Sequence, residues 1–272
     1  MSTPALPRKP ELEDTAEHRS DFNKRLFAVA ISVGFATTLA NMDFVKQGDW
    51  PRSDEWQRLL TLATGLFLSV QSWDGYLRSI AEKRLYGAKR FAIDIFLIFT
   101  YLFLLLTSAH IHIWLWTIAV IFLIYFIWDI LSVREFPECY LPKGRVEKVR
   151  TATAGETFEV YWAGFLGKQD YYRGPVITFS WLVYFVLLAA MCHPPGGSCN
   201  LLMSCIAFVV FGLWQYRGDK NHVTVEMNDG NETKIFGYDM WKRALYVALG
   251  VCGIWLAGIV SPKLCQLMAQ CI

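Results

Sequence analysis

Long apolar runs, separated by short polar stretches, fill most of the sequence after about residue 26. A membrane-spanning helix needs about 20 mainly apolar residues, because the hydrocarbon core is about 30 Å thick and each helical residue rises about 1.5 Å. The pattern therefore predicts an all-α integral membrane protein with about seven transmembrane helices, in one domain over 26–272 behind a polar tail over 1–25. The seven predicted spans are 26–45, 59–76, 91–108, 111–131, 175–192, 201–216 and 244–264.

The lysines and arginines gather in alternate loops. Of the 26, twenty-two lie in the tail or after the second, fourth and sixth spans. Loops rich in these residues stay in the cytoplasm, so the pattern predicts a cytoplasmic N-terminus, an external C-terminus and cytoplasmic loops over 132–174 and 217–243. The predicted location is the cell membrane, or the inner membrane if the source is bacterial. Four basic residues fall on the outer side: Lys46, Arg52, Arg58 and Lys263.

The composition supports a lipid environment. Apolar residues make up 54% of the chain and charged residues 18%, against about 25% charged in an average soluble domain. A formal net charge of +2 gives no reason to expect a nucleic-acid partner. The lipid bilayer is the predicted partner.

Two predicted cytoplasmic loops are longer than simple connectors. Polar and apolar residues alternate on either side of the turn residues 228–231, which predicts a β-hairpin over 222–236. A looser hairpin is predicted over 145–162. Isolated hairpins are marginal in water, so we expect them to pair or to bind a cytoplasmic partner at 217–243 and 135–174. The alternative is that both loops pack on the helix ends.

Three acids lie within predicted spans, near their cytoplasmic ends. An unpaired charge in a membrane is costly, so such residues are candidates for a solute or proton path. They would form a polar inner vestibule together with two neighbours on the same helices. The alternative is that arginines four residues away, Arg78 and Arg90, form salt bridges with two of the acids. The vestibule candidates are Asp74, Asp94, Asp129, Gln71 and Tyr125.

Histidines are few and no catalytic motif is present. His110 and His112 flank Ile111 in one predicted outer loop, and His193 lies in another. They are weak candidates for a metal site, because the pattern lacks a nearby carboxylate. The sequence has no zinc-protease, hydrolase or phosphate-binding motif, so no catalytic residue, metal or cofactor is predicted and an enzyme is not expected.

Four of the seven cysteines fall on the predicted outer side, where an oxidising compartment permits disulfides. One pairing joins the 192–199 loop to the C-terminus, and another closes that loop on itself. The four candidates are Cys192, Cys199, Cys265 and Cys271.

Small residues recur every four positions in the first and last predicted spans. Such stripes allow close helix packing, within one chain or in a homo-oligomer. They consist of Ala28, Ser32, Ala36 and Ala40, and of Gly253, Ala257 and Ser261.

Three functional classes follow. The first is a transporter or channel for a small solute or ion through the polar vestibule. The second is a membrane-embedded sensor or effector whose cytoplasmic hairpins bind a soluble partner, for example in cell defence or stress response. The third is a membrane-embedded enzyme, for which the sequence offers no catalytic group.

Overall fold

A computed structural model describes residues 9–82, 87–136, 174–191 and 205–218. These residues form seven helices and contain no strand. The helices are α1 (Lys9–Ala40), α2 (Asp43–Gln47), α3 (Ser53–Glu82), α4 (Ala88–Leu106), α5 (Ile111–Glu135), α8 (Gly174–Met191) and one further helix over 205–218.

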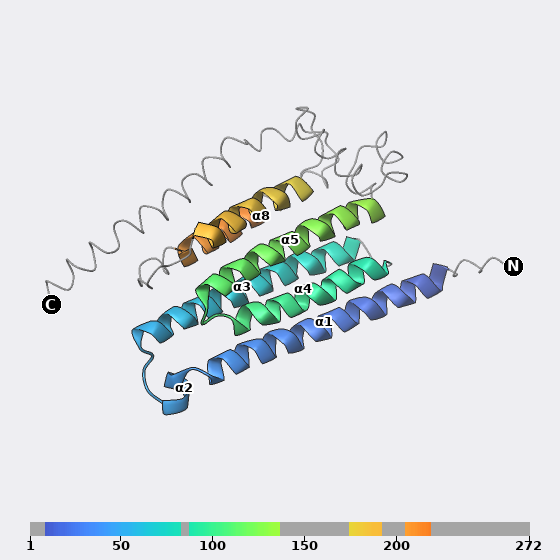
Figure 1. Cartoon of the computed structure of the whole chain (residues 1–272). Coiled ribbons are helices and arrows are strands. Elements are labelled where there is room, and N and C mark those ends of the chain that lie inside the picture. The colour runs from blue at the N-terminus through green and yellow to red at the C-terminus, as the bar shows by residue number, and fades with distance from the viewer. Residues whose placement is uncertain (1–8, 83–86, 137–173, 192–204, 219–272) are drawn as a thin grey trace.

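The long helices lie side by side in one bundle (Figure 1). α4 packs between α1 and α5, and α5 also packs on α8, while α3 contacts α1 and α4. The helix over 205–218 contacts α8, where the Tyr184 hydroxyl donates to the Phe208 carbonyl at 3.0 Å. Helix α1 already begins at Lys9, so it extends through most of the stretch that was predicted to be a polar tail.

A short connection reverses the chain between α1 and α3. Gly48 closes α2 with a φ of 72°, the left-handed conformation that glycine adopts without strain. The Glu55 carboxylate then accepts hydrogen bonds from the backbone N–H groups of Phe44 (2.8 Å) and Arg52 (3.0 Å). The hydrogen bond from Arg52, followed by that from Phe44, lowers the pKa of Glu55 below its ordinary value. One carboxylate therefore holds both sides of the turn.

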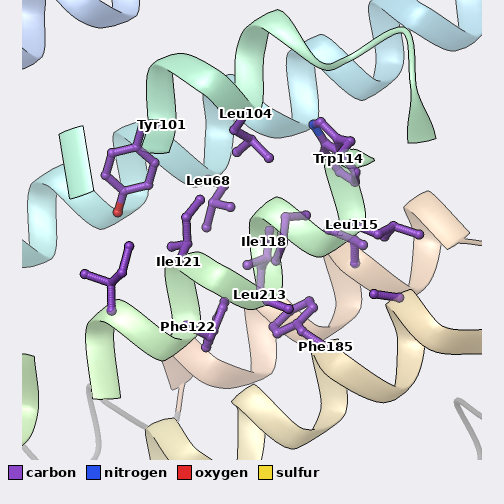
Figure 2. Packing of buried hydrophobic residues seen from close by; sticks show 14 of the residues in the cluster. Leu68, Tyr101, Leu104, Trp114, Leu115, Ile118, Ile121, Phe122, Phe185 and Leu213 are labelled. Atoms are coloured by element: carbon purple, nitrogen blue, oxygen red, sulfur yellow. The ribbon is translucent and has the colours of Figure 1, made fainter. Parts of the chain in front are cut away.

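Helix α5 lies at the centre of the apolar core (Figure 2). Trp114, Leu115, Ile118, Ile121 and Phe122 are buried on it. They meet side chains from the helices on either side of α5. These are Leu68 of α3, Leu104 of α4, Phe185 of α8 and Leu213 of the helix over 205–218.

Two glycines allow the close approach that this packing needs. A Cβ on Gly65 would lie 3.3 Å from the indole nitrogen of Trp114, and one on Gly212 would lie 2.7 Å from the ring of Tyr184. Both distances are too short for an ordinary contact. Bulky aromatic rings can therefore lie directly against these two helix backbones.

The structure corrects the predicted fold class. In the described part of the chain, one helical segment, Ile111–Ser132, is long and apolar enough to cross a membrane, and a shorter apolar segment is Ile177–Ala190. A single such segment is weak evidence, because a buried helix in a soluble protein passes the same test. The prediction of about seven spans on an N-in/C-out path with small cytoplasmic β-hairpins is therefore wrong. The proposed hairpins over 145–162 and 222–236 lie outside the described residues.

The reason for the difference lies in the helix ends and in the buried polar groups. The first apolar run is divided, because α1 ends at Ala40 and a separate short helix follows. The second run, on α3, buries Thr61 and Ser69, whose hydroxyls bond to carbonyls one turn earlier. The third run, on α4, buries Arg90 and Asp94 within the bundle. Hydropathy alone does not distinguish such core helices from membrane spans.

Candidate functional site: the polar end of the bundle

A buried acid, Asp94 of α4, lies where four helices meet. It is 2% exposed and accepts three hydrogen bonds from three other helices. Its Oδ2 accepts from Asn23 Nδ2 of α1 at 3.3 Å and from the Tyr76 hydroxyl of α3 at 3.1 Å. Its Oδ1 accepts from the Trp128 indole N–H of α5 at 2.9 Å. We call these four side chains the Asp94 centre.

An arginine lies one turn before Asp94 on α4. Arg90 is 1% exposed, and its Nη1 donates to Glu135 of α5 at 3.3 Å. Its guanidinium also lies over the rings of Trp128 (4.9 Å) and Phe136 (5.3 Å). Glu135 in turn accepts the Gly87 N–H at 2.9 Å, just before α4 begins. The arginine thus pairs across the bundle with Glu135.

Burial changes the acid–base behaviour of this centre. Loss of solvation raises the pKa of Asp94 to about 7, although Arg90 and the hydrogen bonds from Tyr76 and Trp128 act in the opposite direction. The negative charge of Glu135 raises it slightly further. Burial, followed by the nearby Asp94 charge, also raises the pKa of Tyr76 well above its ordinary value. Asp94 is therefore the group in this centre that can gain or lose a proton near neutral pH.

A run of hydroxyl groups continues inward from the Asp94 centre. The Tyr125 hydroxyl bonds to those of Ser72 and Tyr101, which joins α5 to α3 and α4. Ser72 lies one turn from Tyr76 on α3, so the two polar groups follow each other along one helix face. The Tyr125 ring also stacks on Tyr216, with centroids 6.2 Å apart. Beyond these hydroxyls lies the apolar core shown in Figure 2.

The five predicted vestibule residues do not share one set of partners. Asp94 and Tyr125 belong to the interior polar groups just described. Asp129, which is 7% exposed, accepts a hydrogen bond from the Thr178 hydroxyl of α8 at 2.5 Å. Asp74 pairs with Arg217 at 2.6 Å, and 49% of its side chain is exposed. Gln71 is partly buried on α3.

The three acids therefore have partners on different helices. The sequence pattern indicated the acids but not their partners, because those lie far along the chain: Asn23 is 71 positions from Asp94, and Arg217 is 143 positions from Asp74. The side chain of Arg78 lies outside the described residues. The site residues that sequence reasoning missed are Asn23, Ser72, Tyr76, Tyr101, Trp128, Glu135 and Thr178.

The structure describes two of the three histidines that were weak candidates for a metal site. His110 and His112 lie where α4 turns into α5, and His112 Nε2 is 3.2 Å from the Trp116 indole nitrogen. No group of three metal-ligating side chains occurs within the described ranges. His193 and the four disulfide candidates lie outside those ranges. Cys205, which was not among the candidates, is buried and disulfide-bonded.

The small-residue stripe of α1 faces outward. Ala28, Ser32, Ala36 and Ala40 are all exposed, whereas the buried face of α1 carries residues such as Phe27 and Ile31. The second predicted stripe, in 244–264, lies outside the described residues. A homo-oligomer contact through the first stripe stays a prediction.

An open groove lies beside the polar end, between the first half of α1 and the start of α4. Its volume is about 770 Å³, and acidic, basic and aromatic side chains line it together. Arg19 lies over the Phe91 ring at 5.6 Å, which helps to connect α1 to α4 here. The lining residues are Asp14, Glu17, His18, Arg19, Asp21, Phe22, Arg25 and Phe91.

Comparison of the sequence with protein-family descriptions and with curated proteins, and comparison of the structure with solved structures, found no match.

Proposed function

We propose that this protein is a sensor or effector that works at a membrane, and that its output is a change in the arrangement of its helix bundle. The observation that carries the proposal is the Asp94 centre. One buried, protonatable acid joins α1, α3 and α5 to α4. A change at this single group would alter how four helices meet, which a sensor requires and a simple structural bundle does not.

The outer surface supports a location at a lipid bilayer. Helix α4 exposes aromatic and aliphatic side chains at helical spacing: Phe96, Phe99, Phe103 and Leu106. Helix α5 does the same with Ile113, Trp116, Val120, Leu123 and Ile127. A helix that is apolar on its outer as well as its inner face needs a partner other than water. Acyl chains are the partner that fits, because such residues are exposed on nearly every long helix and not in one patch.

The length of α5 agrees with this location. The segment Ile111–Ser132 has 22 residues. At about 1.5 Å per residue it is roughly 33 Å long, close to the thickness of the hydrocarbon core of about 30 Å. We therefore propose that Ile111–Ser132 enters the bilayer together with the exposed face of α4 beside it.

The polar end is where a partner would act. Helix α5 ends there, and both the 137–173 segment and the 219–272 segment follow helices that end on this side of the bundle. Figure 1 shows the end of α5 near the start of α4, where Glu135 accepts the Gly87 N–H. The charged groove lies at the same end. A soluble partner that binds here would be next to the Asp94 centre.

A second candidate is transport of a proton or small cation. It is favoured by the hydroxyls of Ser72, Tyr101 and Tyr125, which extend the polar groups inward from the Asp94 centre. Chains of protonatable and hydroxyl groups in a bundle are typical of ion and proton paths. In this proposal the apolar core beyond the hydroxyls closes the path, as hydrophobic constrictions do in gated channels.

One reconstitution experiment distinguishes the two candidates. The full chain is placed in phospholipid vesicles, and uptake of protons and of alkali cations is measured beside release of an enclosed dye. A selective flux that Asp94→Asn abolishes, with the dye retained, would support transport and overturn the effector proposal. A sensor or effector gives no selective flux.

A second experiment tests the effector directly. Proteins cross-linked to the chain in its native membrane are identified, and each is purified and titrated against vesicles that contain the chain. We expect binding that is lost when residues 224–234 are deleted and weakened when Arg19 and Arg25 are both changed to Glu. The charge-reversal variant Lys46→Glu, on α2 at the far end of α1, is the matched control. Binding that survives both the deletion and the double change would refute a partner site at the polar end.

A further inference from the structure

The Asp94 centre holds its acid in a place that favours the neutral form. Asp94 is almost fully buried, and the nearest cation, Arg90, donates its hydrogen bond to Glu135. Buried ionised carboxylates are costly, and they either lose their charge or gain access to water. The pKa of about 7 for Asp94 follows from the same burial.

The groups around Asp94 are few and can be named for each packed helix. Helix α1 presents the uncharged Asn23, and α3 presents Tyr76. Helix α5 presents Trp128 and the carboxylate of Glu135, while α4 itself supplies Arg90. Burial of Asp94 among these groups raises its pKa to about 7.

The side-chain amide of Asn23 can hydrogen-bond to Asp94 in either protonation state of the acid. Its Nδ2 donates to Asp94 at 3.3 Å and to the Tyr76 hydroxyl at 3.0 Å, a bond that a half-turn of the amide breaks, while its buried Oδ1 has no hydrogen-bond partner within the described part of the chain. The two ends of an amide group can exchange places by a half-turn of the side chain. After that turn, Oδ1 accepts the O–H of a protonated Asp94. The closed bundle thus accommodates the neutral acid.

We propose that Asp94 is a proton-controlled switch: the polar end stays closed while its carboxyl is protonated, and loss of the proton draws α1 and α3 away so that water reaches the carboxylate. The direction follows from linkage. Burial raises the proton affinity of the closed state, so release of the proton favours any state in which Asp94 is hydrated. The inference deepens the proposed function, because it names the signal and the group that receives it.

The hydrogen bonds and ring contacts near Asp94 indicate which helix ends can separate. Helix α5 is fixed to α8 by the Asp129–Thr178 hydrogen bond and by the packing of Phe122 on Phe185. At this end α1 contacts α3 through the stack of Phe27 on Trp73 (4.1 Å), so an opening that hydrates Asp94 involves the ends of both helices. It is confined to those ends, because α3 also bonds to Tyr125 through Ser72 and to Arg217 through Asp74, and Phe27 of α1 packs edge-on against Tyr101 of α4. The hydrogen bonds from Asn23 and Tyr76 to Asp94 cross the boundary between the two groups of helices.

Hydrogen exchange of the full chain in detergent or vesicles tests the switch. Exchange in 13–25 and 73–82 is followed from pH 5.5 to 8.5 and corrected for the intrinsic pH dependence of amide exchange. We expect the corrected rates to rise with pH by up to about tenfold per unit below pH 7, and to level off above about pH 7, where Asp94 is ionised in the closed state as well as in the open state. Exchange in 177–190, on α8, should stay constant.

Three variants distinguish proton-controlled opening at Asp94 from a general loss of stability of the bundle. Asp94→Asn keeps a neutral group of the same shape, so both segments should stay protected at every pH. Asp129→Asn is the matched control, since it neutralises another buried acid outside the Asp94 centre, and its pH response should equal that of the unchanged protein. Glu135→Gln removes a nearby negative charge and should move the midpoint to lower pH.

Three results would overturn the proposal: no pH-dependent exchange in the unchanged protein, an Asp94→Asn variant that opens with pH as before, or a Glu135→Gln midpoint shifted upward. The first is independent of how any variant folds. These outcomes are also independent of the vesicle and partner experiments above. A failed switch therefore removes the proton as the signal, while the partner and flux experiments still test the sensor or effector proposal. A failed partner experiment leaves the switch measurable.

Discussion

At the scale of single residues, the buried polar side chains act as connections between helices. Asp94 connects α4 to three neighbours, Asp129 connects α5 to α8, and Asp74 connects α3 to the helix over 205–218. Their energetic weights differ. A hydrogen bond to a buried charged group is worth about 1.5–3 kcal/mol, whereas an exposed ion pair such as Asp74–Arg217 contributes about 0–1 kcal/mol.

The connection between α5 and α8 can be tested at Thr178. Replacing Thr178 by Val removes the hydroxyl that donates to Asp129 and leaves a buried carboxylate without that bond. We expect the free energy of unfolding to fall by about 1–3 kcal/mol, measured by denaturant titration in detergent. Thr117→Val is the matched control, because the Thr117 hydroxyl bonds only to the Ile113 carbonyl of its own helix. Equal losses for the two variants would show that Asp129 does not hold α8 in place.

At the scale of helices, α1 has one face for packing and another left open. Its inner face includes Gly34, where a Cβ would lie 2.9 Å from Leu102 and 3.2 Å from Leu105 of α4. Its outer face carries the exposed small-residue stripe, including Ala36. The two positions lie two residues apart, so they differ by about 200° around the helix and test opposite surfaces.

Helix α1 should therefore respond differently to added volume on its two faces. Gly34→Val forces two methyl groups against Leu102 and Leu105, and we expect a loss of about 1–3 kcal/mol in stability from overpacking. Ala36→Val adds a similar side chain on the open face and should change monomer stability by less than about 0.5 kcal/mol. Thermal unfolding followed by circular dichroism measures both. A larger effect at Ala36 would indicate that the stripe is covered, and size measurements would then show whether a second copy covers it.

The apolar runs of the sequence predicted the positions of the helices well in the middle of the chain, but they did not predict what surrounds those helices. The predicted segments 91–108 and 111–131 coincide closely with α4 (Ala88–Leu106) and α5 (Ile111–Glu135). The extent of an apolar run is a local property that a sequence displays directly. The pairing of Arg90 with Glu135 depends instead on contacts 45 positions apart. Local spacing therefore identified the charged groups but could not identify their partners.

The same limit explains the wrong count of spans. A buried core helix and a lipid-facing helix are both apolar, and only the fold shows which side chains are inside. Arg90 and Asp94 were expected near a membrane interface, but they are in the interior of the bundle. Of the fold, the sequence thus predicted helix positions. Of the site, the sequence predicted the acid Asp94 and the hydroxyl of Tyr125. It did not predict that side chains from three other helices bond to Asp94.

At the scale of the whole molecule, the apolar outer surface separates the proposed membrane location from a soluble bundle. Phe103 of α4 and Leu123 of α5 are exposed by 51% and 44%. A charged side chain that must enter hydrocarbon costs about 2.5–3.5 kcal/mol at the bilayer centre, whereas the same side chain on a water-exposed face costs almost nothing. Substitution by Asp at these positions therefore reports directly on what covers them.

We expect the double variant Phe103→Asp/Leu123→Asp to lose most of its association with vesicles in a flotation assay, while keeping its helix content. The matched control is Ala109→Asp, which adds a charge in the exposed turn between α4 and α5, where apolar contact is not required. If the double variant floats as the unchanged protein does, the outer faces do not meet lipid, and the membrane proposal fails. If it also loses its helices in detergent, these side chains pack against protein instead. Loss of flotation with an intact bundle is the result that acyl-chain contact requires.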